Sequence, residues 1–226
     1  MTEAEWLSYE VDLHKKLFFL QDRVSERKLR LFMVACSRRV WNLLATVHRD
    51  AVETSERFAD RLTTAEELST TWRATRVVDG LDGLSENPMD NARFWAEDAA
   101  IQCASEWDRE SAVATSVAWA ISWASNHPSD VAFDAECVEQ AVLLRDIIGN
   151  PFRSFAVDSS WLSWRDSTIP KLAQAIYDER AFDLLPILAD ALEDAGCDNA
   201  DILNHCRQPG EHVRGCWVVD LLLGKE

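Results

Sequence analysis

The chain has 226 residues, of which 47% are hydrophobic, so it can bury a sizeable core in one domain or two small ones. It contains 7 glycines and 6 prolines, a low share that disfavours collagen-like chains and loop-rich β-sandwiches. No run approaches the ~20 apolar residues that span a bilayer, and no secretory leader opens the chain, so we expect a cytoplasmic protein without membrane contact. The net charge of −16 argues against general binding to nucleic acid, whose phosphates repel an acidic surface.

Three helices are predicted in the first third of the chain. Between positions 25 and 45 apolar residues recur at helical spacing, and Ser25 is a suitable N-cap. A second helix is expected at about 50–62, after a break near His48. Thr64 and Glu67 form a capping-box pattern that opens a third helix, which runs to about position 78. Three helix-breaking residues then follow: Gly80, Gly83 and Pro88.

The segment 89–125 is rich in alanine and tryptophan. Its tryptophans are Trp95, Trp107, Trp119 and Trp123. The first three are twelve residues apart, which rotates each by about 120° on a straight helix, so one unbroken helix is not expected. We interpret these rings as anchors that pack against several neighbouring helices, with ligand stacking as the alternative.

Helical patterns continue to the end of the chain. After a turn at 126–130, a helix at 135–148 is stopped by the sequence Gly-Asn-Pro that begins at position 149. A helical hairpin follows and ends at Gly196 in a left-handed conformation, and Asp198 then caps a short helix. The final apolar segment VRGCWVVDLLLG is interpreted as a buried helix, because no partner strand is evident.

These patterns predict an all-α fold, an irregular multi-helix bundle with a C-terminal helical hairpin module. We predict an N-terminal helical region at 1–148, an irregular connector at 149–167 and a C-terminal helical module at 168–226. One continuous core through both helical regions is the alternative.

Basic residues gather between positions 23 and 39, where there are six of them against one acidic residue. They could pair with acidic helices of the same molecule, which is the ordinary arrangement. Alternatively, they could form a docking face for an acidic partner or for nucleic acid. We do not expect nucleic acid to bind to any other part of the protein. The residues of such a face would be Arg27, Arg30, Arg38 and Arg39.

The six cysteines include three, at positions 36, 103 and 137, that have apolar neighbours at helical spacing and are expected to be buried thiols. The other three lie near the C-terminus together with two histidines. Four of these residues offer nitrogen and sulfur ligands of the kind that zinc prefers: Cys197, His205, His212 and Cys216. No C-x2-C knuckle is present, so the alternative is that the cysteines pack in the core and the histidines bond to helix ends. No cofactor other than zinc is expected.

A catalytic interpretation of the same region has His212 activating Cys216, with Asp220 or Glu211 orienting the histidine. Burial near Trp217 would raise the pKa of this thiol and oppose the role. The sequence contains no phosphate-binding loop, metalloprotease, hydrolase-elbow or EF-hand motif. We therefore do not predict an enzyme.

Several long motifs resemble a large paralogous family of planctomycete bacteria. They are MTEAEW, RKLRLF, CSRRVW, LLRDIIGNPFR, AIYDERAFDLLPILADALEDAGC and HCRQPGEHVRGCWVVDLLLGKE, which together cover about half of the chain at both ends. The resemblance implies no catalytic role for any residue. The last motif resembles a module appended to otherwise different proteins, which implies an interaction or assembly element.

Together these observations predict a non-enzymatic interaction or accessory protein, an acidic all-α scaffold whose partner is another protein, of basic character. One alternative is a zinc-stabilised helical domain. Another is a regulatory subunit of a larger complex, which could mimic the charge of nucleic acid.

Overall fold

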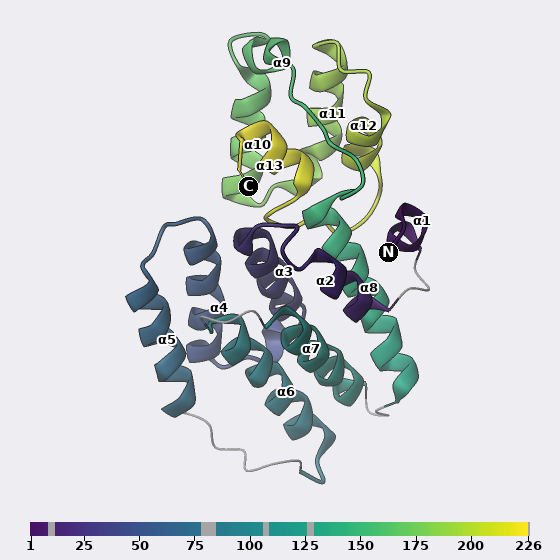
Figure 1. Cartoon of the computed structure of the whole chain (residues 1–226). Coiled ribbons are helices and arrows are strands. Elements are labelled where there is room, and N and C mark those ends of the chain that lie inside the picture. Colours follow the sequence, from purple (N-terminus) through teal and green to yellow (C-terminus); the bar gives the residue numbers. More distant parts are fainter. Residues whose placement is uncertain (9–11, 78–84, 106–108, 126–128, 226) are drawn as a thin grey trace. The chain divides into compact units, whose positions relative to one another are not determined.

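The computed structural model describes residues 1–8, 12–77, 85–105, 109–125 and 129–225. All the regular secondary structure in these residues is helical, which confirms the all-α prediction (Figure 1). The chain divides into two compact units, Met1–Val142 and Leu143–Glu226. None of the helices in the described ranges is both long and apolar enough to cross a membrane. The predicted breaks at Gly80 and Gly83, part of the predicted turn at 126–130 and Trp107 lie outside the described residues.

The first unit is built around one central helix. Its elements are α1 (Glu3–Leu7), α2 (Leu13–Leu20), α3 (Glu26–Arg39), the 3-10 turn η1 (Trp41–Leu43), α4 (Thr46–Ala59), α5 (Ala65–Val77), α6 (Pro88–Cys103), α7 (Glu110–Ala124) and most of α8 (Asp130–Ile148). Every residue of α3 from Leu29 to Ser37 is buried. Helices α4, α6 and α7 pack around α3, and α6 and α7 lie side by side (Figure 1).

Two predicted helix starts in this unit are confirmed. The Ser25 hydroxyl accepts a hydrogen bond from the backbone N–H of Lys28 at 3.3 Å and caps α3. At the start of α5, the Thr64 hydroxyl accepts from the Glu67 N–H at 3.2 Å, and the Glu67 carboxylate accepts from the Thr64 N–H at 3.0 Å. These reciprocal bonds are the predicted capping box.

Other boundaries differ from the prediction. Helix α4 begins before His48, which is buried within it and does not break the chain. The helix predicted from position 25 ends at Arg39, where the chain tightens into η1. The segment 89–125 contains two helices, as its tryptophan spacing suggested, and Trp119 on α7 contacts aromatic rings on α6 and α8: Trp95 at 6.4 Å and Phe133 at 4.7 Å between ring centroids.

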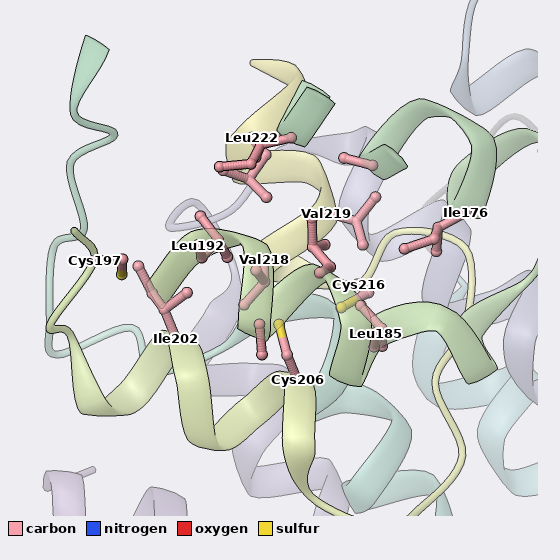
Figure 2. Close-up of a cluster of buried hydrophobic side chains, with 14 of the residues drawn as sticks. Ile176, Leu185, Leu192, Cys197, Ile202, Cys206, Cys216, Val218, Val219 and Leu222 are labelled. Carbon is pink, nitrogen blue, oxygen red and sulfur yellow. The ribbon is translucent and has the colours of Figure 1, made fainter. Parts of the chain in front are cut away.

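The second unit contains five further α-helices in the described residues and the last turns of α8. They are α9 (Ser159–Ser163), α10 (Thr168–Glu179), α11 (Leu185–Asp194), α12 (Ala200–Arg207) and α13 (Trp217–Leu223), with a 3-10 turn η2 (Phe182–Leu184) before α11. Helix α10 packs against α11 and α13, and α11 packs against α12. Side chains from these helices form one apolar core (Figure 2). The predicted helical hairpin is α10 with α11, and the final apolar segment forms the buried helix α13.

Local turns in this unit follow the predicted chemistry, with one correction. Gly196 has φ +92° after α11, as predicted. The cap of α12, however, is Asn199 and not Asp198, since the Asn199 side chain accepts from the N–H groups of Asp201 and Ile202 at 3.0 and 3.3 Å. Asparagine is as good an N-cap as aspartate, and it lies directly before the first helical residue.

The segment 149–167 is not a separate connector. It contains α9, and Trp161 belongs to the apolar core of the second unit, with Phe155 and Val157 packed against it. The division between the units therefore falls at residues 142 and 143, inside α8, and not within 149–167. Apolar residues that a helix pattern leaves unassigned can still belong to a core.

Candidate metal centre

A buried carboxylate lies in the last turns of α8. The Asp146 side chain is 3% exposed, and its Oδ2 accepts a hydrogen bond from the backbone N–H of Val213 at 2.9 Å. Its Oδ1 is 2.6 Å from Nδ1 of His212 and 3.2 Å from Nε2 of His205. One oxygen is thus held by the backbone, and the other faces two imidazoles.

His205 lies near the end of α12, and both of its ring nitrogens have polar neighbours. Its Nε2 is 3.2 Å from Sγ of Cys216, in addition to its contact with Asp146. Its Nδ1 is 3.3 Å from the side-chain amide nitrogen of Gln208. The ring also packs against Trp217, at 5.2 Å between centroids, so its orientation is fixed from several directions.

His212 and Cys216 come from the segment that joins α12 to α13. Cys216 is the N-cap residue of α13 and is fully buried. The His212 side chain is 7% exposed, and its Nε2 is buried without a hydrogen bond of normal geometry to any described residue. The two imidazole rings lie edge to face at 5.0 Å between centroids. This short segment therefore brings two more ligand-type side chains to Asp146 and His205.

The four residues form what we call the Asp–His–His–Cys cluster: Asp146, His205, His212 and Cys216. Each offers one ligand atom, and these atoms all lie within 4.8 Å of one another. Zinc bonds of about 2.0–2.3 Å in a tetrahedron place ligand atoms roughly 3.3–3.7 Å apart. The two contacts of 3.2 Å are close to this spacing, and the 2.6 Å contact would have to widen. The cluster could therefore hold a metal ion.

Burial and mutual contact set the protonation of the cluster. Burial alone would raise the pKa of Asp146, but its hydrogen bonds to His205 and His212 outweigh burial and hold the pKa below the usual value. For His212 burial acts in the opposite direction and would lower the pKa, but the contact with the Asp146 carboxylate raises it above the usual value. The pKa of Cys216 is raised well above its ordinary value by burial and by the charge of Asp146. A cation at this position would stabilise both the carboxylate and a thiolate.

The geometry does not form the relay that a cysteine nucleophile needs. The histidine in contact with Cys216 is His205, not His212, and the same nitrogen faces both the thiol and Asp146. A relay uses one ring nitrogen for the nucleophile and the other for the carboxylate. Asp220 is buried in α13, whereas Glu211 is exposed. The buried thiol with its raised pKa favours a structural role for Cys216.

The structure brings together three of the four residues predicted as zinc ligands. Cys197 is instead part of the apolar core, well away from Cys216 (Figure 2). Asp146 takes the fourth place, and the sequence analysis did not identify it. A signal was present, because Asp146 lies among the buried apolar residues Leu144 and Ile147, where an unpaired charge is unfavourable.

The arginines of the predicted basic face all make contacts within the first unit. Arg27 pairs with Asp60 at 3.0 Å and Arg38 with Glu56 at 3.0 Å. Arg39 binds both carboxylate oxygens of Glu136, at 2.6 and 2.8 Å. These contacts match the intramolecular explanation of the basic stretch.

Arg30 was predicted to lie on an outer face, but it is buried. Its guanidinium donates to the carbonyl oxygens of Cys103 and Ser105, each at 3.2 Å, at the end of α6. It also lies over the ring of Phe58, at 5.0 Å from the centroid. A cation at a helix C-terminus complements the helix dipole, so Arg30 serves the fold.

The six cysteines are free thiols, and Cys36 and Cys103 are buried as predicted, whereas Cys137 is half-buried. No protein-family model, curated protein or solved structure matches this chain. The resemblance to the planctomycete family thus stays a prediction.

Proposed function

We propose that this protein is a non-enzymatic helical interaction protein whose second unit is stabilised by a zinc ion held by the Asp–His–His–Cys cluster. The observation that carries the proposal is the convergence of four buried ligand-type atoms from α8, α12 and the α12–α13 segment. Zinc would join these parts of the chain at one point, and such a bond contributes directly to folding.

A structural role fits the ligand set better than a catalytic one. Structural zinc sites have four protein ligands, whereas catalytic sites keep a position for water or substrate. Four protein ligands are available here, and the side chains of Asp146, His205 and His212 are 3%, 9% and 7% exposed. With Cys216 fully buried, little room remains for a substrate.

The chemistry of the ligands favours zinc over hard cations. Calcium and magnesium prefer sites made of oxygen atoms, and this cluster offers one carboxylate. Two imidazoles and a thiolate suit zinc, which has no geometric preference of its own and accepts the tetrahedron that four such groups define.

The interaction part of the proposal is supported by charge. The net charge of −16 would attract a basic protein surface and speed its association. The segment 208–211 between two cluster residues is exposed. Zinc would hold the two ends of this segment in place, so that it presents a defined surface to a partner.

The proposal is tested on the purified 226-residue chain by elemental analysis and by exchange of the bound metal for Co²⁺. We expect one zinc per chain, and a cobalt form with the thiolate-to-metal absorption and intense visible bands of tetrahedral coordination. Cys216→Ser should lose the thiolate absorption and most of the metal. Cys206→Ser is the matched control, because Cys206 is also buried and adjoins His205 but is not in the cluster.

Equal metal content in the two serine variants would contradict the proposed site. So would a wild-type chain that takes up no zinc when it is refolded with a slight excess of the ion. Cys197→Ser discriminates further, since the sequence alone predicted this residue as a ligand and the structure does not bring it to the cluster.

A further inference from the structure

The side-chain amide of Gln208 lies beside the ring nitrogen of His205 that faces away from the cluster. Its nitrogen is 3.3 Å from Nδ1 of His205. Nε2, on the other side of the ring, is 3.2 Å from both Oδ1 of Asp146 and Sγ of Cys216. Depending on which end of the amide faces the ring, Gln208 can donate to Nδ1 or accept from Nδ1–H.

Metal binding requires one particular tautomer of His205. Nε2 is the His205 atom that faces Asp146 and Cys216, so its lone pair must point to the ion. The ring proton must then be on Nδ1, where it needs an acceptor. The Gln208 amide can supply one, because rotation by half a turn exchanges its nitrogen for its carbonyl oxygen at nearly the same position.

We propose that Gln208 is the positioning residue that selects the metal-binding tautomer of His205, with its amide oxygen directed at Nδ1–H when zinc is bound. This inference rests on the proposed zinc site. When zinc binds, His205 holds its ring proton on Nδ1, the proton between Nδ1 of His212 and Oδ1 of Asp146 leaves to solvent, and the Cys216 thiol releases its proton to solvent. Bonds form from zinc to nitrogen, sulfur and oxygen, and no atom is oxidised or reduced.

The position of Gln208 allows this rotation. It is the C-cap of α12, and its backbone N–H bonds to the carbonyl of Asn204 at 2.8 Å, so the backbone is fixed. Gln208 is exposed, which leaves room for its side-chain amide to turn. Gln208 also follows His205 by three residues, a spacing that places both side chains on one face of the helix end.

The test is calorimetric titration of the full chain with zinc chloride in a competing chelator of known affinity. Gln208→Met has a similar length, but its thioether accepts hydrogen bonds only weakly. We expect about 10–100-fold weaker binding, as for other outer-shell partners of metal ligands. Gln208→Glu presents an acceptor to Nδ1–H, so it should retain or exceed wild-type affinity. Gln174→Met is the matched control, because this glutamine bonds to Asp178 outside the cluster.

A second measurement follows the tautomer itself. Nitrogen-15 spectra of histidine-labelled, metal-free protein should show more of the Nδ1–H tautomer of His205 in Gln208→Glu than in Gln208→Met, a difference that a purely structural role for Gln208 would not predict. Wild-type affinity in Gln208→Met, or equally weak binding by the Met and Glu variants, would overturn the inference and leave the zinc site standing. Failure of the wild type to bind zinc would instead overturn the proposed function.

Discussion

The two units differ in how they stabilise buried charge. In the first unit, the buried carboxylates of Glu136 and Glu56 pair with Arg39 and Arg38, respectively. In the second unit, the buried carboxylate of Asp146 is surrounded by two imidazoles and a thiol. An arginine keeps its positive charge at all ordinary pH values, whereas an imidazole is charged only when protonated.

This difference indicates where an added cation would matter. Glu56 and Glu136 of the first unit have permanently charged side-chain partners and so gain little from a metal ion. The second unit compensates Asp146 with groups whose usual chemistry includes metal binding, and its fully buried thiol has a raised pKa. The comparison therefore predicts that metal affects the second unit alone.

The largest expected effect is that of a strong chelator on the second unit. When free zinc exceeds the dissociation constant by a thousandfold, binding stabilises the folded unit by about 4 kcal/mol. Chelation should remove this stabilisation, which hydrogen exchange would detect as lost protection in α12 and α13. Protection in α3 and α4 is the internal control. Equal loss of protection in both pairs of helices would contradict the prediction that metal stabilises only the second unit.

An effect of similar size is expected in the first unit, from Arg39→Met. The Arg39 side chain is 19% exposed and that of Glu136 only 3%, so the variant leaves a buried carboxylate without its charged partner, although the Gln140 amide still donates a hydrogen bond to its Oε1. Breaking such a pair typically costs about 3–5 kcal/mol. Denaturant unfolding would measure the loss, which should be the same with and without chelator. Arg39→Met combined with Glu136→Leu should recover part of it, since the unpaired charge is removed.

The sequence predicted the helices of both units well because their signals are local. Ser25 and the Thr64–Glu67 pair are caps that a few neighbouring residues determine, and the structure confirms both. Three cluster residues lie close together in the sequence, so their grouping was visible too. Asp146 was missed because its partners follow more than fifty residues later, and only the packing of α8 against the α12–α13 segment brings them together.

The packing that supports the cluster can be tested at Gly149. This residue has φ +72°, and a Cβ atom there would lie 2.9 Å from Cγ of Trp217, which packs against His205. Gly149→Ala should therefore lower the stability of the second unit by about 1–3 kcal/mol and weaken zinc binding. Gly224→Ala is the control, because it has φ +62° but no atom within 4 Å of the added Cβ. If the two variants have the same zinc affinity, Trp217 does not position His205.

The smallest effect is expected at an exposed carboxylate of the first unit, Glu67. Hydrogen bonds from the Thr63 hydroxyl and the Thr64 backbone N–H hold its pKa below the usual value of 4.5. Because the folded pKa is lowered, its stabilisation is present above the unfolded pKa and is lost as the pH falls through the folded pKa. Glu67→Gln should thus be less stable than wild type at pH 7, with the difference vanishing in acid.

Glu66→Gln removes a charge from the same first turn without breaking the capping box, so urea unfolding across this pH range should show a smaller difference for it. Identical pH profiles for the two variants would mean that the bonds to Thr63 and Thr64 add nothing beyond the negative charge at the helix start.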